Sequence, residues 1–193
     1  MFVFRGTFEP AMAVLATWAP HDGVLGLVAP LGLAAAAGDC LVVDLDPAGP
    51  LFPGGSSLAK LVADGPRRAD LMPARRGLAV LSNGGVGIEA AWEVVTGLTR
   101  GWPAVVLRLA AHPPPNLGVP VVPIRPLLPG RLFPNDARPA VYQAAGWGNT
   151  LPGPGVVLPR PRAGSWAALL AGRLPRKDRW IRSWERVWRM PWV

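Results

Sequence analysis

The feature that most limits the fold of this chain is a series of short, almost uninterrupted apolar runs. Stretches of helical character separate these runs. A strand that is apolar on both sides must be covered on both faces, which is the situation of strands in a parallel sheet. The clearest runs of this kind are 12–17, 40–45, 78–82 and 104–109. Between and around them, helices are predicted over 27–37, 57–63 (capped by Ser56 or Ser57) and 88–99. The alternation predicts an α/β fold with a mostly parallel, doubly wound sheet and helices on both faces.

The second half of the chain is harder to order because proline and glycine are dense there. Residues 119–124 (VPVVPI) are expected to form an edge or terminal strand, since each proline removes a backbone donor from the ladder. Between Pro126 and Pro161, only a helix near 137–145 and a strand over 155–158 are predicted.

The composition favours one globular domain and leaves little material for disulfide or metal chemistry. Half of the 193 residues are hydrophobic, far above the level of a disordered chain, so the 23 glycines and 24 prolines are expected to mark loops. Cys40 is the one cysteine, which excludes a disulfide framework and a cysteine-based zinc site. Cys40 is expected in the core and His21 in a loop, and no metal site is predicted.

A segment that crosses a membrane is not expected. The most apolar uncharged run, 23–38, has 16 residues with Pro30 in its middle, and about 20 are needed to cross a bilayer. Glu9 and Asp22 precede the apolar part of this run, which argues against a cleaved signal peptide.

Positive charge is concentrated near the C-terminus. Residues 158–193 hold nine of the 20 Lys and Arg and two of the 12 Asp and Glu, a net charge of +7, whereas the first 157 residues carry +1. The body of the protein is therefore nearly neutral and its tail is cationic.

Two acids directly follow the second apolar run, in the sequence Asp44-Leu45-Asp46-Pro47, and glycines at 23 and 26 precede that run. Over residues 12–110 this order resembles the ParA/MinD family of deviant Walker ATPases. In that family a strand, a lysine-bearing glycine loop ending in Gly-Lys-Thr-Thr, a helix, and a strand ending in Asp-Leu-Asp-Pro follow one another. An ungapped register places the Gly-Lys-Thr of the family on Leu25, Gly26 and Leu27, and its third strand on 71–81.

The departures from the family fall on the groups that its chemistry needs. Phosphoryl transfer in P-loop proteins uses backbone N–H donors, a lysine on the phosphates, a hydroxyl on magnesium and an acid that positions the metal. Gly26 has no charge, Leu27 has no hydroxyl, and Arg108 stands where the family has the acid. The resemblance therefore implies a pseudo-ATPase with no catalytic residues, no resident cofactor and at most weak binding of ATP. The predicted remnant of the nucleotide site consists of Gly23, Gly26, Leu27, Asp44, Asp46 and Arg108.

The resemblance also makes two geometric predictions. If the helix after the loop begins near Gly26 or Leu27, Pro30 lies in its first turn, where N–H groups have no intrahelical partner. The strands that end at Asp44 and at Arg108 are neighbours in the family. Arg108 is therefore expected beside Asp44 or Asp46, supplying the positive charge of a magnesium ion. The alternative is that the two acids merely end a strand and start a turn, and that the glycines are ordinary loop residues.

The tail combines tryptophan with arginine in the sequence RKDRWIRSWERVWRMPW, residues 176–192. Pro175 suits the first turn of a helix and Pro191 its end. Helical spacing places the apolar side chains on one face and spreads the arginines over the rest. The apolar face consists of Trp180, Ile181, Trp184, Val187 and Trp188, and the arginines are Arg179, Arg182, Arg186 and Arg189.

Three roles are open for this predicted amphipathic helix. Its tryptophans can dock on the sheet of the chain itself, where each buries roughly 150–250 Å². They can instead enter a membrane surface, since each basic residue gains about 1 kcal/mol near anionic lipid. The third role is binding of nucleic acid, for which the near-neutral body offers no extended basic surface.

The expected function is a non-catalytic scaffold or localisation subunit for membrane-associated machinery, because the chain is similar to the localisation factors of pilus and type II secretion loci. That similarity implies a protein partner such as a secretion or pilus ATPase, and a place in the cytoplasm or at the inner face of the membrane. A weak nucleotide-binding ATPase completed by a lysine of a partner chain, and a nucleic-acid-binding protein, are the alternatives. Residues 1–172 are expected to form the α/β domain and 173–193 the basic helix.

Overall fold

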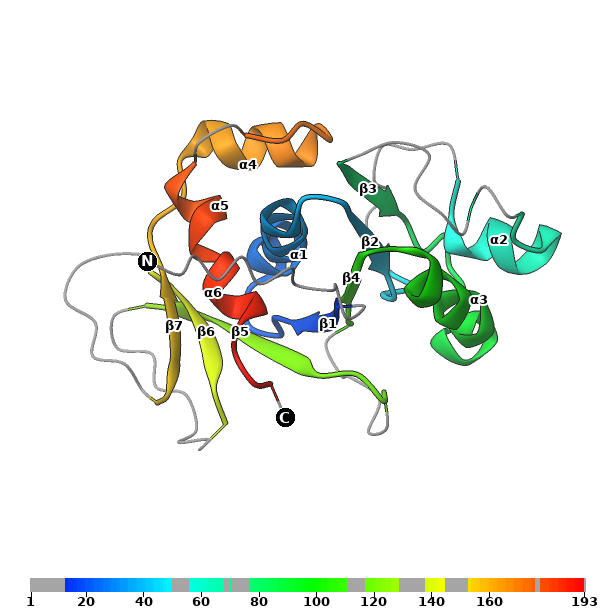
Figure 1. Cartoon of the computed structure of the whole chain (residues 1–193), viewed down its shortest axis with the longest axis horizontal. Helices are drawn as coiled ribbons and strands as arrows, with labels where there is room; N and C mark the ends of the chain where they lie inside the picture. The colour runs from blue at the N-terminus through cyan, green and yellow to red at the C-terminus, as the bar shows by residue number, and fades with distance from the viewer. Residues whose placement is uncertain are drawn as a thin grey trace, which may run out of the picture.

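The computed structural model describes residues 13–49, 56–67, 70, 77–110, 117–128, 138–144, 153–175 and 178–192. The strands are β1 (Ala13–Trp18), β2 (Cys40–Asp44), β3 (Leu78–Leu81), β4 (Ala104–Arg108), β5 (Val121–Leu127), β6 (Ala140–Ala144) and β7 (Gly155–Leu158). The helices are α1 (Gly23–Ala37), α2 (Leu58–Asp64), α3 (Ile88–Gly101), α4 (Ala163–Leu170), α5 (Arg179–Ser183) and α6 (Glu185–Trp188). All described strands form one parallel sheet in the order β3-β2-β4-β1-β5-β6-β7 (Figure 1). The predicted α/β class is confirmed.

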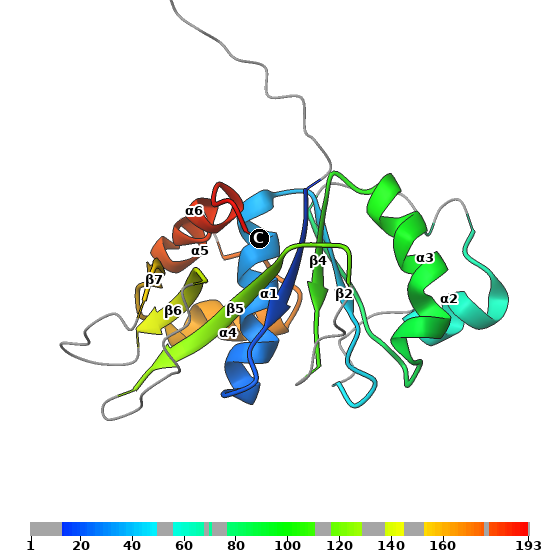
Figure 2. The ribbon, with the colours of Figure 1, turned by 90° about the horizontal axis from the view of Figure 1, so that it is seen from below.

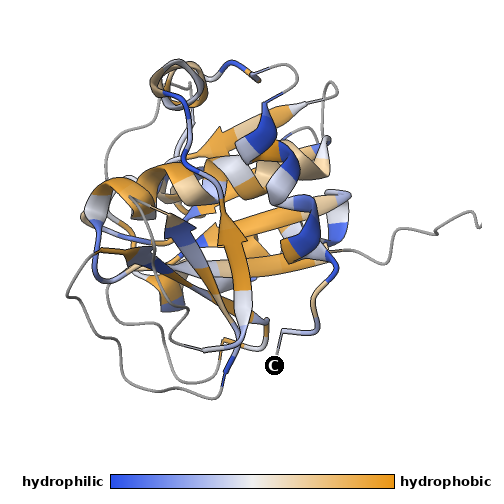
Figure 3. Cartoon of the chain, turned by 90° about the vertical axis from the view of Figure 1, so that its left-hand side faces the viewer, coloured by the Kyte–Doolittle hydropathy of each residue, from blue (hydrophilic) through white to orange (hydrophobic). Residues whose placement is uncertain are grey.

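Helices cover both faces of this sheet. Helix α1 lies on one face together with α4, α5 and α6, whereas α2 and α3 lie on the other (Figure 2). Along β2, Cys40 and Val42 pack toward α1, and the alternate residues Leu41 and Val43 pack toward α2 and α3. This two-sided burial explains why the strands are apolar throughout and appear mostly hydrophobic in Figure 3.

Strand β5 lies inside the sheet, between β1 and β6, so the prediction of an edge strand over 119–124 is wrong. The prolines of this strand are tolerated because each half is paired on one side only. Residues 121–123 pair with β1, and residues 124–127 pair with β6. Each half therefore behaves as an edge, where a missing backbone donor costs little.

The region after β5 differs from its prediction in two ways. Residues 140–144 form strand β6 in place of the helix predicted over 137–145. Helix α4 spans Ala163–Leu170, where no helix was predicted. The predicted strand over 155–158 is confirmed as β7. The part of the family's third strand at 71–76 lies outside the described residues.

The tail forms two short helices, α5 and α6, and not one helix that starts at Pro175. Asp178 caps α5, because its carboxylate accepts the N–H groups of Trp180 and Ile181. It also accepts the Ser165 hydroxyl, which ties α5 to α4. Burial alone would raise the pKa of Asp178, but these hydrogen bonds outweigh it and hold the pKa below its usual value.

The tryptophan face of the tail packs on α1. Trp180 and Trp184 are almost fully buried, and their rings meet edge to face with centroids 5.5 Å apart. A Cβ at Gly32 of α1 would lie 2.6 Å from Trp184 Nε1, so the glycine makes room for the two rings. Of the three open roles, docking on the chain itself is the one that the structure shows, although the tail packs mainly on α1 and not on the sheet as predicted.

Candidate functional site

The candidate site lies at the carboxyl ends of β1, β2 and β4, where α/β sheets bind their ligands. Asp44 ends β2, Arg108 ends β4, and the two residues are directly opposite each other in the parallel register. Thr17 of β1 is opposite Arg108 on the other side of β4. The predicted adjacency of Arg108 to the two acids is confirmed by this pairing and by the contacts described next.

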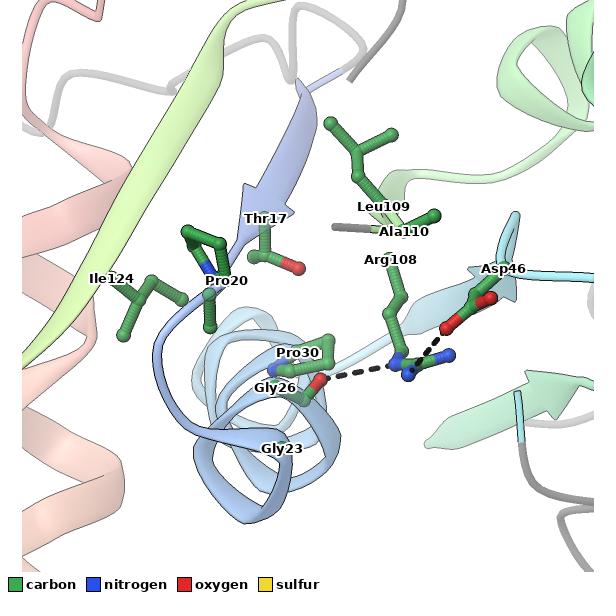
Figure 4. Close-up of a pocket in the computed structure, with 11 residues that line it drawn as sticks. Thr17, Pro20, Gly23, Gly26, Pro30, Asp46, Arg108, Leu109, Ala110 and Ile124 are labelled. Atoms are coloured by element: carbon green, nitrogen blue, oxygen red, sulfur yellow. Dashed lines mark hydrogen bonds and ion pairs between the residues drawn. The ribbon is translucent and has the colours of Figure 1, made fainter. Parts of the chain in front are cut away.

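The Arg108 guanidinium binds three oxygens from two separate segments, the end of β2 and helix α1. Its Nη1 lies 2.6 Å from Asp44 Oδ1, and its Nη2 lies 3.0 Å from Asp46 Oδ2. Its Nε donates to the carbonyl oxygen of Gly26 at 3.1 Å (Figure 4). The guanidinium thus links the ends of β2 and β4 to the first turns of α1, and we call this set of residues the Arg108 cluster.

Pro30 explains why the Gly26 carbonyl can accept this hydrogen bond. In an α-helix the carbonyl of residue 26 would receive the N–H of residue 30, and proline has no N–H. The structure places Pro30 inside α1, seven positions after its start at Gly23, and not in the first turn. The carbonyl left without a helical donor is the one that Arg108 Nε satisfies.

The segment between β1 and α1 is too short to be a phosphate-binding loop. Only residues 19–22 separate the strand from the helix, because α1 begins at Gly23 and not near Gly26 or Leu27 as predicted. Gly23, Gly26 and Leu27 therefore have helical backbone and form no cradle of loop amides. At the helix N-terminus the Asp22 side chain accepts the N–H of Leu25 at 2.9 Å, so the chain's own carboxylate takes the place of an anion.

Asp44 is completely buried beneath this arrangement. Its Oδ1 accepts the N–H of Asp46 at 3.0 Å as well as Arg108 Nη1, while its Oδ2 has no hydrogen-bond partner among the described residues. Burial raises the pKa of Asp44, and the hydrogen bond from Asp46 and the charge of Arg108 oppose that rise. Gly49 covers the pair closely, since a Cβ there would lie 2.6 Å from Arg108 Nη1.

A small cavity of about 180 Å³ lies beside the guanidinium. Pockets for drug-sized ligands and cofactors run from about 300 to 1,000 Å³, so this one is too small for a nucleotide. The side chains of Asp46 and Arg108 form its charged wall (Figure 4). The rest of its lining is Thr17, Ala19, Pro20, Gly23, Gly26, Pro30, Leu109, Ala110 and Ile124.

Neither a metal-ligand cluster nor a reactive thiol is found among the described residues. Within the described ranges, no cluster of three or more His, Cys, Asp and Glu is placed to hold a metal ion. The Cys40 thiol is buried, and burial raises its pKa to about 12, so it remains protonated at neutral pH.

The structure buries some of the predicted site residues of the tail and exposes others. Trp180, Trp184 and Val187 are buried in the core, and Ile181 is 8% exposed, so these side chains form no free face for a membrane or a partner. Trp188 is half-buried and donates its Nε1–H to the Leu33 carbonyl at 2.9 Å. The arginines of the tail, by contrast, remain exposed: Arg179, Arg182, Arg186 and Arg189.

Sequence reasoning missed three residues that shape this site: Asp22, Pro30 as a helix-interior residue, and Gly49. Asp22 followed by an apolar run is an ordinary N-cap signal and could have been recognised. The roles of Pro30 and Gly49 depend on Arg108, which is distant in sequence, so no local signal points to them.

Comparison with protein-family models and with curated proteins finds no match for this sequence. None of the helices in the described part of the chain is long and apolar enough to span a membrane.

Proposed function

We propose that this protein is a non-catalytic relative of the ParA/MinD ATPases that acts as a scaffold or localisation subunit. The observation that carries the proposal is the Arg108 cluster, in which a side chain of the protein supplies the positive charge between two strand-end carboxylates. A bound magnesium ion can exchange, whereas a covalently attached guanidinium stays. A site of this kind has one state and no nucleotide-driven switch.

The surroundings of Arg108 support the same proposal. Nucleotide hydrolysis needs a cation on the phosphates, a ligand for magnesium and room for a triphosphate. Here the helix N-terminus is capped by Asp22, the cavity measures about 180 Å³, and Gly49 packs over the ion pair. A scaffold gains from this arrangement because the buried contacts hold β2, β4 and α1 in one geometry.

The proposal is tested by titrating the intact chain with ATP in the presence and absence of magnesium, by calorimetry and by phosphate release. No saturable binding is expected up to about 1 mM ATP, which corresponds to less than about 4 kcal/mol of binding free energy. Magnesium-dependent binding in the micromolar range, or turnover, would overturn the proposal and favour the ATPase alternative.

A gain-of-function variant tests the same proposal from the opposite direction. The double change Gly26→Lys and Leu27→Thr introduces the residues that the ParA/MinD motif carries at these positions. Both lie in helical backbone behind the Asp22 cap, so we expect this variant to bind ATP no better than the parent chain. If it acquires magnesium-dependent binding, residues 19–27 can form a phosphate loop and the single-state site is disproved.

We further propose that the protein works in the cytoplasm, at the membrane face, through a protein partner such as a pilus or secretion ATPase. Trp180, Trp184 and Trp192 of the tail are buried in the core, so their insertion into lipid would require the tail to leave α1. Sedimentation with anionic liposomes tests this route: the chain alone is expected to stay in the supernatant. Co-sedimentation at physiological salt would favour a direct lipid contact.

A further inference from the structure

A groove runs between strand β7 and the short helices of the tail. One wall carries Arg179, Arg182 and Arg186, which are spaced three and four residues apart and so lie on the same side of α5 and α6. The other wall is formed by Val157 and Pro159 at the end of β7. The groove has a volume of about 500 Å³, within the range of ligand and peptide sites, and none of the described residues that line it is acidic.

The three arginines are exposed and held on a rigid base. Among the described residues none of the three forms an ion pair, and the nearby Glu185 contacts Arg189 at 3.8 Å. The base is rigid because Trp180 on the opposite side of α5 is buried and donates its Nε1–H to Gln143 Oε1 of β6 at 2.7 Å. A partner would therefore meet guanidinium groups that need little reorganisation of the backbone.

Strand β7 offers backbone groups along the same groove. It is the last strand of the sheet that the structure describes, and it pairs only with β6. Ala140 of β6 donates to the Pro154 carbonyl at 3.1 Å. Because successive residues of a strand direct their backbone groups to opposite sides, Val156 also faces β6, and Gly155 and Val157 face outward. This open edge lies on the left in Figure 1, and Figure 3 turns that side of the molecule toward the viewer.

We propose that this groove binds an extended acidic segment of another protein, which adds to the sheet as a strand beside β7. Outward backbone groups of β7 would pair with the backbone of the segment, as in other cases of strand addition. Alternate side chains of the segment would then meet the arginine wall, where carboxylates form strong, often bidentate hydrogen bonds. The remaining side chains would cover Val157, which is 40% exposed. The groove does not involve the Arg108 cluster, so its test is independent of the nucleotide tests.

The test measures binding of a fluorescein-labelled peptide, Glu-Val-Asp-Ile-Glu-Val-Asp, to the full chain by anisotropy at about 50 mM salt. A peptide with lysine at each acidic position is the ligand control. The triple change Arg179→Glu, Arg182→Glu and Arg186→Glu is expected to weaken binding at least tenfold. A matched triple change outside the groove, Lys60→Glu, Arg100→Glu and Arg173→Glu, alters the net charge equally and is expected to change binding less than twofold.

A second variant separates strand addition from simple charge attraction. Val157→Pro removes an outward N–H while the bonds of Val156 and Leu158 to β6 remain, and we expect it to weaken binding about tenfold. Circular dichroism verifies that each variant is folded. The proposal is overturned if Val157→Pro binds as the parent does, if the two triple changes weaken binding equally, or if the peptide fails to bind. Binding to phosphatidylserine vesicles without binding to the peptide would also overturn it, in favour of a lipid surface.

Discussion

At the scale of single residues, Arg108 decides the chemistry of the sheet edge. Its side chain is 11% exposed and that of Asp44 is fully buried, so their contact is shielded from solvent. The formation of a buried ion pair contributes little net stability, because desolvation of both charges offsets their attraction. Removal of one partner is different, since it leaves the other charge buried and uncompensated.

The change Arg108→Met should therefore destabilise the fold by about 3–5 kcal/mol at pH 7. The second change, Asp44→Asn, removes the buried carboxylate charge that Arg108→Met leaves unpaired. The double variant should therefore recover part of the lost stability. Urea unfolding of the parent, the two single variants and the double variant gives the coupling energy directly. If the double variant is no more stable than Arg108→Met alone, the Asp44 carboxylate is not the group that Arg108 neutralises.

The loss of stability caused by Arg108→Met should also depend on pH. Burial raises the pKa of Asp44 in the folded protein above its value in the unfolded chain, and loss of Arg108 removes an opposing influence. A raised pKa means that the folded state binds the proton more tightly than the unfolded chain does. Acidification therefore stabilises the folded state, and this stabilisation is lost as the pH rises through the folded-state pKa. The difference in unfolding free energy between parent and Arg108→Met should thus be smaller at about pH 4.5 than at pH 7. Asp178, with its lowered pKa, acts in the opposite direction in both proteins and cancels in this difference. A difference in unfolding free energy that does not change with pH would contradict the prediction.

At the scale of elements, α1 shows what sequence reasoning could and could not predict. Most strands and the helices α2 and α3 can be predicted from local sequence patterns. A strand buried on both faces has a continuous apolar run, and a helix buried on one face has apolar residues at helical spacing. The start of α1 was predicted wrongly because an interior proline costs about 3 kcal/mol in an isolated helix. The Gly26 carbonyl that this proline leaves without a helical donor is satisfied by Arg108, 82 positions further along the chain than Gly26, and no local rule detects such a partner. The tail is similar: the spacing of its tryptophans identifies a buried face but does not indicate what covers it.

Pro30 and Arg108 should therefore be energetically coupled. Pro30→Ala restores an N–H that can bind the Gly26 carbonyl, but in the parent protein Arg108 already occupies that oxygen. In the Arg108→Met background the carbonyl is free, so the same change should be more favourable there by about 1 kcal/mol. Thermal or urea unfolding of the four proteins measures this coupling, and additive effects would show that the hydrogen bond from Nε contributes nothing.

Two glycines of α1 provide a matched test of the contact with the tail. Helix propensity alone predicts that Gly→Ala stabilises a helix interior by about 1 kcal/mol. At Gly26 a Cβ would meet the Ala19 carbonyl at an ordinary 3.6 Å, so Gly26→Ala should be neutral or stabilising. At Gly32 the Cβ would overlap the rings of Trp180 and Trp184, so Gly32→Ala should destabilise by about 1–3 kcal/mol. Urea unfolding followed by tryptophan fluorescence distinguishes them, and equal effects at both positions would place the tail elsewhere.

At the scale of the whole molecule, the tail separates its two kinds of side chain. Trp180, Trp184 and Val187 point into the core cluster that also contains α1 and the central strands, while the arginines face outward. The cationic surface is therefore presented by a segment whose own folding depends on the rest of the protein. A tail that only bound membranes or nucleic acid would be dispensable for the fold, whereas this one is part of the core.

Truncation after residue 175 tests this difference. Loss of a buried Trp side chain typically costs about 3–5 kcal/mol, against a total stability of about 5–15 kcal/mol for a domain. The truncation removes three buried tryptophans, Trp180, Trp184 and Trp192. We expect the truncated chain to lose cooperative unfolding, to bind a hydrophobic dye and to expose the face of α1 that carries Gly32. The full-length triple change at Arg179, Arg182 and Arg186 serves as the control, because it alters the charge of the tail and leaves its buried side chains in place. A truncated chain that unfolds cooperatively at the temperature of the parent would show that the tail is an appendage, and the membrane role would again be open.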